Sequence, residues 1–198
     1  MNTLEAVNQM LSAVGEAPVT TIDTDNPELG IALATLNQVN KEVQAERWHF
    51  NREYNYSLTP NTDGEFVLPE NVLFIQVNKD RFPVLFDLTV RAGKLYDRRS
   101  HSFKFTTEQI LVDVVWAFPF DDIPLPFKLY IAQRAARVFV SRSQGSQEMV
   151  RLANIDEERL RANCVAYDAD EQKLTMAVDR NRNQYNNTFR PFDAVWRF

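Results

Sequence analysis

The sequence predicts an α+β protein: a bundle of two N-terminal and two C-terminal helices, an inserted small antiparallel β-sheet or barrel domain, and an extended C-terminal arm. Apolar residues recur at helical spacing near both ends of the chain, and they alternate with polar residues in the middle. The last stretch has few helix formers but many aromatic residues. The expected domains are residues 1–50, 51–123, 124–180 and 181–198.

The first helix is expected over residues 3–14. Its apolar stripe consists of Leu4, Val7, Leu11 and Val14. Thr3 is the expected N-cap, and Gly15 follows the stripe where a left-handed residue commonly ends a helix.

A second helix is expected to begin at Pro27, with Asn26 as its cap, and to run to about Trp48. One face of it is apolar and the opposite face is polar. The apolar face carries Leu29, Leu33, Leu36, Val39 and Val43.

From Asn51 onward the apolar period changes to two, which is typical of strands with one buried face. Tyr54, Tyr56 and Leu58 then belong to one face of the first strand. Five or six antiparallel strands are expected, over residues 54–58, 65–68, 71–78, 84–90, 94–97 and 110–117.

Helical spacing returns at Phe127 and predicts a helix to about Ser141, then a last helix from about Gln147 to Asp179. At 1.5 Å per residue the last helix would reach about 50 Å. A domain of this size does not need such a helix for its own core, so we expect it to pack against a neighbour or another subunit. The arm after it either docks on a partner through its aromatic residues or folds back on its own domain.

Composition and charge exclude several classes of protein. The chain of 198 residues has a net charge of −5 and no run near the roughly 20 apolar residues of a membrane span. No secretory signal is visible at its start. One cysteine and two histidines leave no zinc-type ligand set, so we expect neither cofactor nor metal. The acidic balance does not favour a nucleic-acid reader.

Residues with catalytic potential are few. His49 and His101 lack a partner at helical metal-site spacing, and Cys164 lies on an apolar stripe, where a thiol behaves as a small hydrophobe. Neighbouring carboxylates such as Asp121 and Asp122 lie in polar sequence, so a solvated turn is a simpler interpretation than a catalytic pair. Phosphate-binding and nucleophile-elbow motifs are missing from the sequence. The chain is therefore not expected to be an enzyme.

The order of four motifs resembles the tail tubular protein A family of short-tailed podoviruses with autographivirus-type tails. A first helix ends in VGEAPV and a second ends in RWHFN. LYDR followed by a serine, and DDIP leading into FKLYIAQRAARVFVSRSQGS, complete the match. The resemblance covers about residues 3–165.

The resemblance implies a structural virion protein: a head-to-tail adaptor of which about twelve copies form a ring under the portal. The ring would join the portal to the tail nozzle, a tail tubular protein B-like partner, and enclose the channel through which DNA leaves. A tail fibre is a further candidate partner. DNA would pass without sequence-specific binding. The virion tail, assembled in the host cytoplasm, is the expected location, with no membrane. An adaptor with an added glycan or peptidoglycan hydrolase activity is the alternative.

Two sets of contact residues are expected. The candidates for the portal are Phe127, Tyr130, Arg134, Arg137, Tyr185, Phe189, Phe192, Trp196 and Phe198. The candidates for the nozzle are Lys79, Asp80, Arg81, Phe82, Arg98, Arg99 and His101. Residues 1–50 carry a net charge of −5 and residues 124–163 a net charge of +3, so these segments are expected to attract each other between neighbouring copies.

Overall fold

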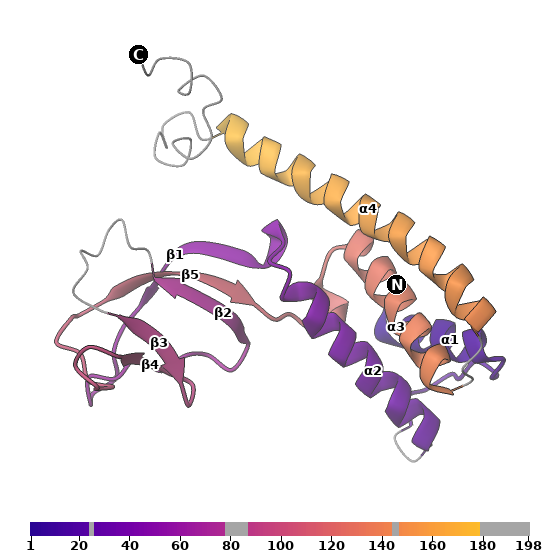
Figure 1. Cartoon of the computed structure of the whole chain (residues 1–198), viewed down its shortest axis with the longest axis horizontal. Coiled ribbons are helices and arrows are strands. Elements are labelled where there is room, and N and C mark those ends of the chain that lie inside the picture. Colours follow the sequence, from indigo (N-terminus) through magenta and orange to yellow (C-terminus); the bar gives the residue numbers. More distant parts are fainter. Residues whose placement is uncertain (24–25, 78–86, 144–146, 179–198) are drawn as a thin grey trace.

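A computed structural model describes residues 1–23, 26–77, 87–143 and 147–178. Within these described residues, four helices form a bundle at one end of the molecule, and five strands lie at the other end (Figure 1). The strands fall between the second and third helices in the chain, so the predicted α+β class and the inserted position of the strands are confirmed. The expected arm over residues 181–198 lies outside the described residues.

The two N-terminal helices begin at well-formed caps. Helix α1, Thr3–Val14, is capped by Asn2 rather than by Thr3, because Asn2 and Glu5 bond to each other's backbone N–H in a capping box. Gly15 ends this helix at φ 84°, as predicted. Helix α2, Pro27–Gln44, starts after its cap Asn26 but ends four residues before the predicted Trp48.

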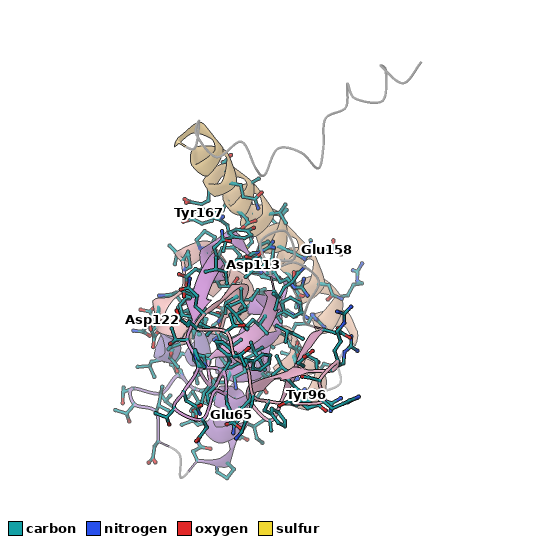
Figure 2. The ribbon with its side chains drawn as sticks, turned by 90° about the vertical axis from the view of Figure 1, so that its left-hand side faces the viewer. Glu65, Tyr96, Asp113, Asp122, Glu158 and Tyr167 are labelled. Atoms are coloured by element: carbon teal, nitrogen blue, oxygen red, sulfur yellow. The ribbon has the colours of Figure 1, made fainter. Side chains whose placement is uncertain are left out.

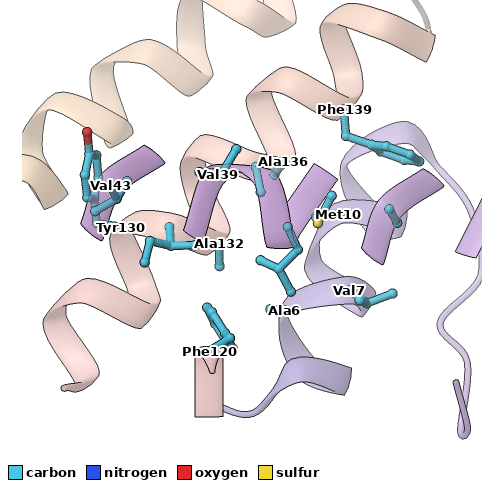
Figure 3. Close-up of a cluster of buried hydrophobic side chains, with 14 of the residues drawn as sticks. Ala6, Val7, Met10, Val39, Val43, Phe120, Tyr130, Ala132, Ala136 and Phe139 are labelled. Carbon is cyan, nitrogen blue, oxygen red and sulfur yellow. The ribbon is translucent and has the colours of Figure 1, made fainter. Parts of the chain in front are cut away.

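Helix α3, Leu125–Ser143, is the central helix of the bundle, in contact with α1, α2 and α4. It buries Phe127, Tyr130, Ile131, Ala132, Ala135, Ala136, Phe139 and Val140. Figure 3 shows the side chains of α1, α2 and α3 meeting in this core, with Phe120 closing it from the loop before α3. Helix α4, Gln147–Val178, is the longest element and covers α3 from outside (Figure 1).

The strands form two small antiparallel sheets rather than a closed barrel. One sheet has the order β1 (Arg52–Leu58), β5 (Ile110–Trp116), β2 (Val72–Val77), and the other pairs β3 (Leu88–Arg91) with β4 (Lys94–Asp97). The strand predicted over 65–68 is wrong: this segment makes only single bridges, from Glu65 to Lys104 and from Val67 to Lys94.

A second hydrophobic core lies on the inner face of the three-stranded sheet. It contains Leu58, Phe66, Leu95, Phe105, Ile110, Val112 and Val114. The alternation along β5 therefore directs Ile110, Val112 and Val114 inward, as their spacing predicts.

A β-bulge in β1 separates two tyrosines that simple alternation puts on one face. The register slips between Glu53 and Tyr56, and Asn55 has φ 56°. Tyr56 therefore packs toward the second core, while Tyr54 is 42% exposed on the opposite side of the sheet. The expected common face for the two residues is wrong for this reason.

Buried amides join the bundle to the sheets. The Gln44 side chain donates to the carbonyl of Phe118 and accepts from its N–H, both at 2.8 Å. Asn40 donates to the same carbonyl, and Asn51 donates to the carbonyls of Gln44 and Trp116. The chain thus leaves the bundle and returns to it at one hydrogen-bonded junction.

Within the described segments, the helices lack the combination of length and apolar character that crossing a membrane requires.

Candidate interaction surfaces

Two of the residues expected to contact the portal are core residues. Phe127 and Tyr130 are 0% and 1% exposed, because both lie on the faces of α3 that its neighbours cover. The Phe127 ring contacts the rings of Trp48, Phe50 and Tyr167. Their place among the portal contacts is therefore corrected: both side chains hold the bundle together.

Arg134 and Arg137, the other α3 candidates, take part in an ion-pair network that crosses three helices. Arg134 lies near Glu42 of α2 and near Glu46, which follows that helix, and Arg137 pairs closely with Glu157 of α4. Arg161 of α4 reaches Glu46 at 3.2 Å, while the Tyr130 hydroxyl lies 3.1 Å from Arg134 Nη1. We call Arg134, Arg137, Arg161, Glu42, Glu46 and Glu157 the arginine network.

The arginine network changes one expectation about charge. The basic segment 124–163 was expected to attract the acidic segment 1–50 of a neighbouring copy. Arg134 and Arg161 instead meet Glu42 and Glu46 of their own chain. At least part of this complementarity therefore acts within the protomer.

The residues with catalytic potential have structural partners. Asp121 accepts hydrogen bonds from the backbone N–H and hydroxyl of Thr3, both at 2.8 Å, and so ties the start of α1 to the loop before α3. Cys164 is buried and lies 3.3 Å from the carbonyl of Pro126. Burial raises the pKa of the Cys164 thiol to about 12, which disfavours the thiolate that a nucleophile requires. Among the described residues no cluster of three or more His, Cys, Asp and Glu could hold a metal ion.

Three of the expected nozzle residues lie together in an exposed loop after β4. Arg98, Arg99 and His101 are all exposed and directly follow β4, one of the strands that lie opposite the bundle (Figure 1). Arg98 pairs with Asp87 at 2.7 Å. Lys79, Asp80, Arg81 and Phe82 lie outside the described residues, as do the tail aromatics Tyr185, Phe189, Phe192, Trp196 and Phe198.

Asp97 holds this loop in place. It is 3% exposed, and its two oxygens accept bonds from the N–H of Asp87, Arg99 and Ser100 and from the Ser100 hydroxyl. Burial alone would raise the pKa of Asp97, but these hydrogen bonds outweigh it and keep the pKa below its ordinary value.

The outer face of the three-stranded sheet carries a compact patch that the sequence reasoning missed. Arg52, Val115 and Phe74 form one row across β1, β5 and β2. The Arg47 guanidinium lies 3.7 Å from the centre of the Phe74 ring, and that of Arg52 lies 4.5 Å from the centre of the Tyr54 ring. We call Arg47, Arg52, Tyr54, Phe74 and Val115 the arginine–aromatic patch. Alternating basic and aromatic residues in RWHFNREYNY were its only signal in the sequence.

Helix α4 extends well beyond the helix on which it packs. It has 32 residues against 19 in α3. Three contacts fix its register on the bundle. Glu157 pairs with Arg137, and Cys164 lies beside the carbonyl of Pro126. Asp168 accepts a hydrogen bond from the His49 N–H at 2.6 Å. At 1.5 Å per residue, the ten residues after Asp168 extend about 15 Å farther. Both views show this end of α4 projecting from the body (Figures 1 and 2).

The two sides of α4 differ. The inner side packs on the bundle through Ala153, Glu157, Leu160, Cys164 and Tyr167. The opposite side is exposed, and we call Glu158, Ala162, Val165, Ala169 and Gln172 its outer stripe. Residues 153–172 hold six acidic and two basic side chains, a net charge of −4, and those after Arg161 are all acidic. The outer stripe is therefore apolar at its centre, and the exposed charged side chains beside it are of both signs, Arg159 and Arg161 among them.

The chain matches a known protein family along most of its length. A family model described as "Tail tubular protein" matches residues 4–174, which include both the bundle and the sheets. A curated relative, tail tubular protein A of Klebsiella phage KP34, is 27% identical over 155 residues, covering 77% of this chain and 80% of the relative. Because the match spans most of the chain and all the described elements, the protein belongs to the tail tubular protein family and is a structural component of a bacteriophage tail.

Proposed function

We propose that this chain is one protomer of a head-to-tail adaptor ring of about twelve copies, assembled in the host cytoplasm. The ring joins the portal to the tail nozzle, with a tail fibre as a further candidate partner, and encloses the DNA channel. Membership of the tail tubular protein family supports the tail location. The ring, its copy number and its partners are our inference.

The observation that carries the proposal is the length of α4. Helix α4 continues for ten residues, about 15 Å, past the hydrogen bond between Asp168 and the His49 N–H, and this end projects from the body (Figures 1 and 2), so it offers a surface on which another chain can pack. A closed ring needs heterologous contacts, in which one surface of a protomer meets a different surface of the next. The projecting helix is one such surface, separate from both ends of the molecule.

The two ends of the molecule suit two different partners. We assign the bundle end and the tail aromatics to the portal. On α3 this leaves Leu125 and Leu129, which are 54% and 37% exposed, in place of the buried Phe127 and Tyr130. We assign the loop with Arg98, Arg99 and His101 to the nozzle, together with the expected residues 79–82.

Asp121 favours a structural role over the hydrolase alternative. Its carboxylate accepts two hydrogen bonds from Thr3 at the start of α1. The negative charge of the carboxylate also interacts favourably with the positive end of the α1 dipole. A general acid would instead need a carboxyl group that is open to a glycan in a cleft. We therefore propose no hydrolase activity.

The test is the mass of the purified chain by light scattering, alone and mixed with the portal protein of the same phage, followed by electron microscopy of any assembly. We expect a ring in at least one of the two conditions. A chain that stays monomeric or dimeric in both would overturn the proposal. Saturable glycan hydrolysis, lost in an Asp122→Asn variant that still folds, would instead support the alternative.

A further inference from the structure

Helix α4 is attached to the bundle from outside and contributes little to its core (Figure 1). Among the described residues, the buried cluster of the bundle comes from α1, α2, α3 and the segments beside them, and Cys164 is its one member from α4. Leu160 and Tyr167 add partly buried contacts, while Ile155 is 59% exposed. Departure of α4 would therefore uncover part of this core without breaking the contacts among α1, α2 and α3.

Polar contacts supply much of the attachment of α4. Glu157 pairs with Arg137 of α3, and Arg161 lies 3.2 Å from Glu46. Water reaches the second pair, because the Arg161 and Glu46 side chains are 53% and 30% exposed. Exposed ion pairs contribute little to stability. These contacts therefore define the register of α4 but hold it weakly.

The surface under α4 fits one kind of occupant. The two ion pairs place opposite charges across it. The Phe127 ring meets the Tyr167 ring, with centres 6.1 Å apart, and the Pro126 carbonyl lies beside Cys164. Every copy of the chain carries both this surface and the helix that fits it. A second copy therefore offers α4 a site with the same charges and the same register.

The connection between α3 and α4 is short. Helix α3 ends at Ser143 and α4 begins at Gln147, so three residues separate the two helices in the sequence. Short connections between packed elements favour the exchange of an element between copies of a protein. An exchanged element makes on its neighbour the contacts that it makes within its own chain, so the exchange needs no new surface.

We propose that, in the ring, α4 of each protomer packs on the bundle of the next protomer, in the position that it occupies on its own bundle in the single chain. The occupant of this surface is a second copy of the same helix. The contact is heterologous, because the helix of one protomer meets the bundle of the next, and it can therefore close a ring. This inference rests on the proposed ring and names the element that links its protomers.

The experiment reverses one ion pair from either side, in whichever condition the unmodified chain assembles. The bundle variant carries Arg137→Glu and the helix variant carries Glu157→Arg. In each variant alone, like charges meet wherever α4 docks, so we expect assembly to require at least about 10-fold more protein. In an equimolar mixture, α4 of one variant meets the opposite charge on the bundle of the other. The required concentration should then return to within about threefold of that of the unmodified chain.

Two controls accompany the mixture. A chain that carries both Arg137→Glu and Glu157→Arg restores the pair in either arrangement, so it should assemble normally. Glu158→Arg changes the neighbouring, exposed residue and should also assemble normally, which separates the pair from an effect of net charge. Urea unfolding verifies that each variant is folded.

The outcomes are distinct. A mixture that assembles no better than its components would mean that α4 stays on its own bundle, and would overturn this inference while leaving the ring intact. Normal assembly of both single variants would also overturn it, because the docking of α4 would then not link protomers. An unmodified chain that assembles in neither condition would overturn the ring itself, and with it this inference.

Discussion

Asp97 fixes the loop that we assign to the nozzle, because four donors converge on its two oxygens. In Asp97→Asn, the amide nitrogen replaces one acceptor and leaves two donors of the loop without a bond. We expect a loss of about 1–3 kcal/mol in the free energy of unfolding, measured by urea denaturation. Asp122→Asn, at an exposed position, is the matched control and should change little.

The lowered pKa of Asp97 also predicts how this contribution depends on pH. A carboxyl group with a lower pKa in the folded state stabilises above its unfolded pKa of about 3.9, and loses that contribution as pH falls through the folded value. The stability difference between the unmodified chain and Asp97→Asn should therefore be constant near neutral pH and shrink below about pH 4. A difference that stays constant to pH 2 would contradict this explanation.

Cys164 reports on the docking of α4. With its pKa raised to about 12, the buried thiol should react with a disulfide reagent at least roughly 100-fold more slowly in the folded chain than in the unfolded one. Its rate should rise with pH between 7 and 9 without levelling off. Fast labelling of the folded chain, with a plateau near pH 9, would mean that the thiol is solvated.

Among the elements, the junction between bundle and sheets depends on Gln44. Gln44→Ala removes both bonds to Phe118 from a fully buried site, so we expect a loss of about 2–3 kcal/mol in unfolding free energy. Gln38→Ala, on the exposed side of the same helix, is the control. Denaturation followed separately by fluorescence and far-ultraviolet circular dichroism shows whether the bundle and the sheets still unfold together. Equal denaturation midpoints for Gln44→Ala and Gln38→Ala would contradict the role of Gln44.

The arginine network attaches α4 to the bundle. Glu157→Gln neutralises the partner of Arg137, so we expect a roughly 10-fold loss of hydrogen-exchange protection in residues 153–164. Glu158→Gln changes the neighbouring, exposed residue and should leave the protection unchanged. Equal effects of the two substitutions would mean that general charge, and not the network, holds the helix.

The sequence allowed most element boundaries to be predicted, because their signals are local. The Asn26–Pro27 start of α2 and the Gly15 end of α1 depend only on caps and backbone freedom. The end of α2 was missed because it depends on a tertiary arrangement: the Trp48 indole donates to the carbonyl of Val43 after the chain has turned at Arg47. That bond leaves no periodic trace in the sequence.

The contact residues were harder to predict than the elements. Phe127 and Tyr130 show an apolar stripe, but a stripe does not reveal how many helices surround it. On α3, with neighbours on three sides, the whole stripe became core. The arginine–aromatic patch was missed for the opposite reason, since Arg47 and Phe74 come from separate segments that only the sheet brings together.

At the scale of the whole molecule, the net charge of −5 suits the wall of the DNA channel that we propose. A protein that neutralises few phosphates gains little from counterion release, so duplex DNA should not be retained in a filter-binding assay even at 50 mM salt. A basic protein of similar size serves as the positive control. Retention that falls steeply as salt is raised would indicate a basic DNA-binding surface and contradict this expectation.

The single junction at Gln44 has an evolutionary consequence. The segment between Asn51 and Phe118 leaves and re-enters the bundle at adjacent points, and it has its own core. Another segment could therefore take its place without a change in how the helices are connected. Recombination between phages could then exchange this segment as a cassette, and the sheets, which we propose to meet the nozzle, would change while the bundle stayed the same. The amide groups of Asn40, Gln44 and Asn51 would have to find equivalent backbone partners in the incoming segment, and Arg47 would need a replacement for its contact with Phe74.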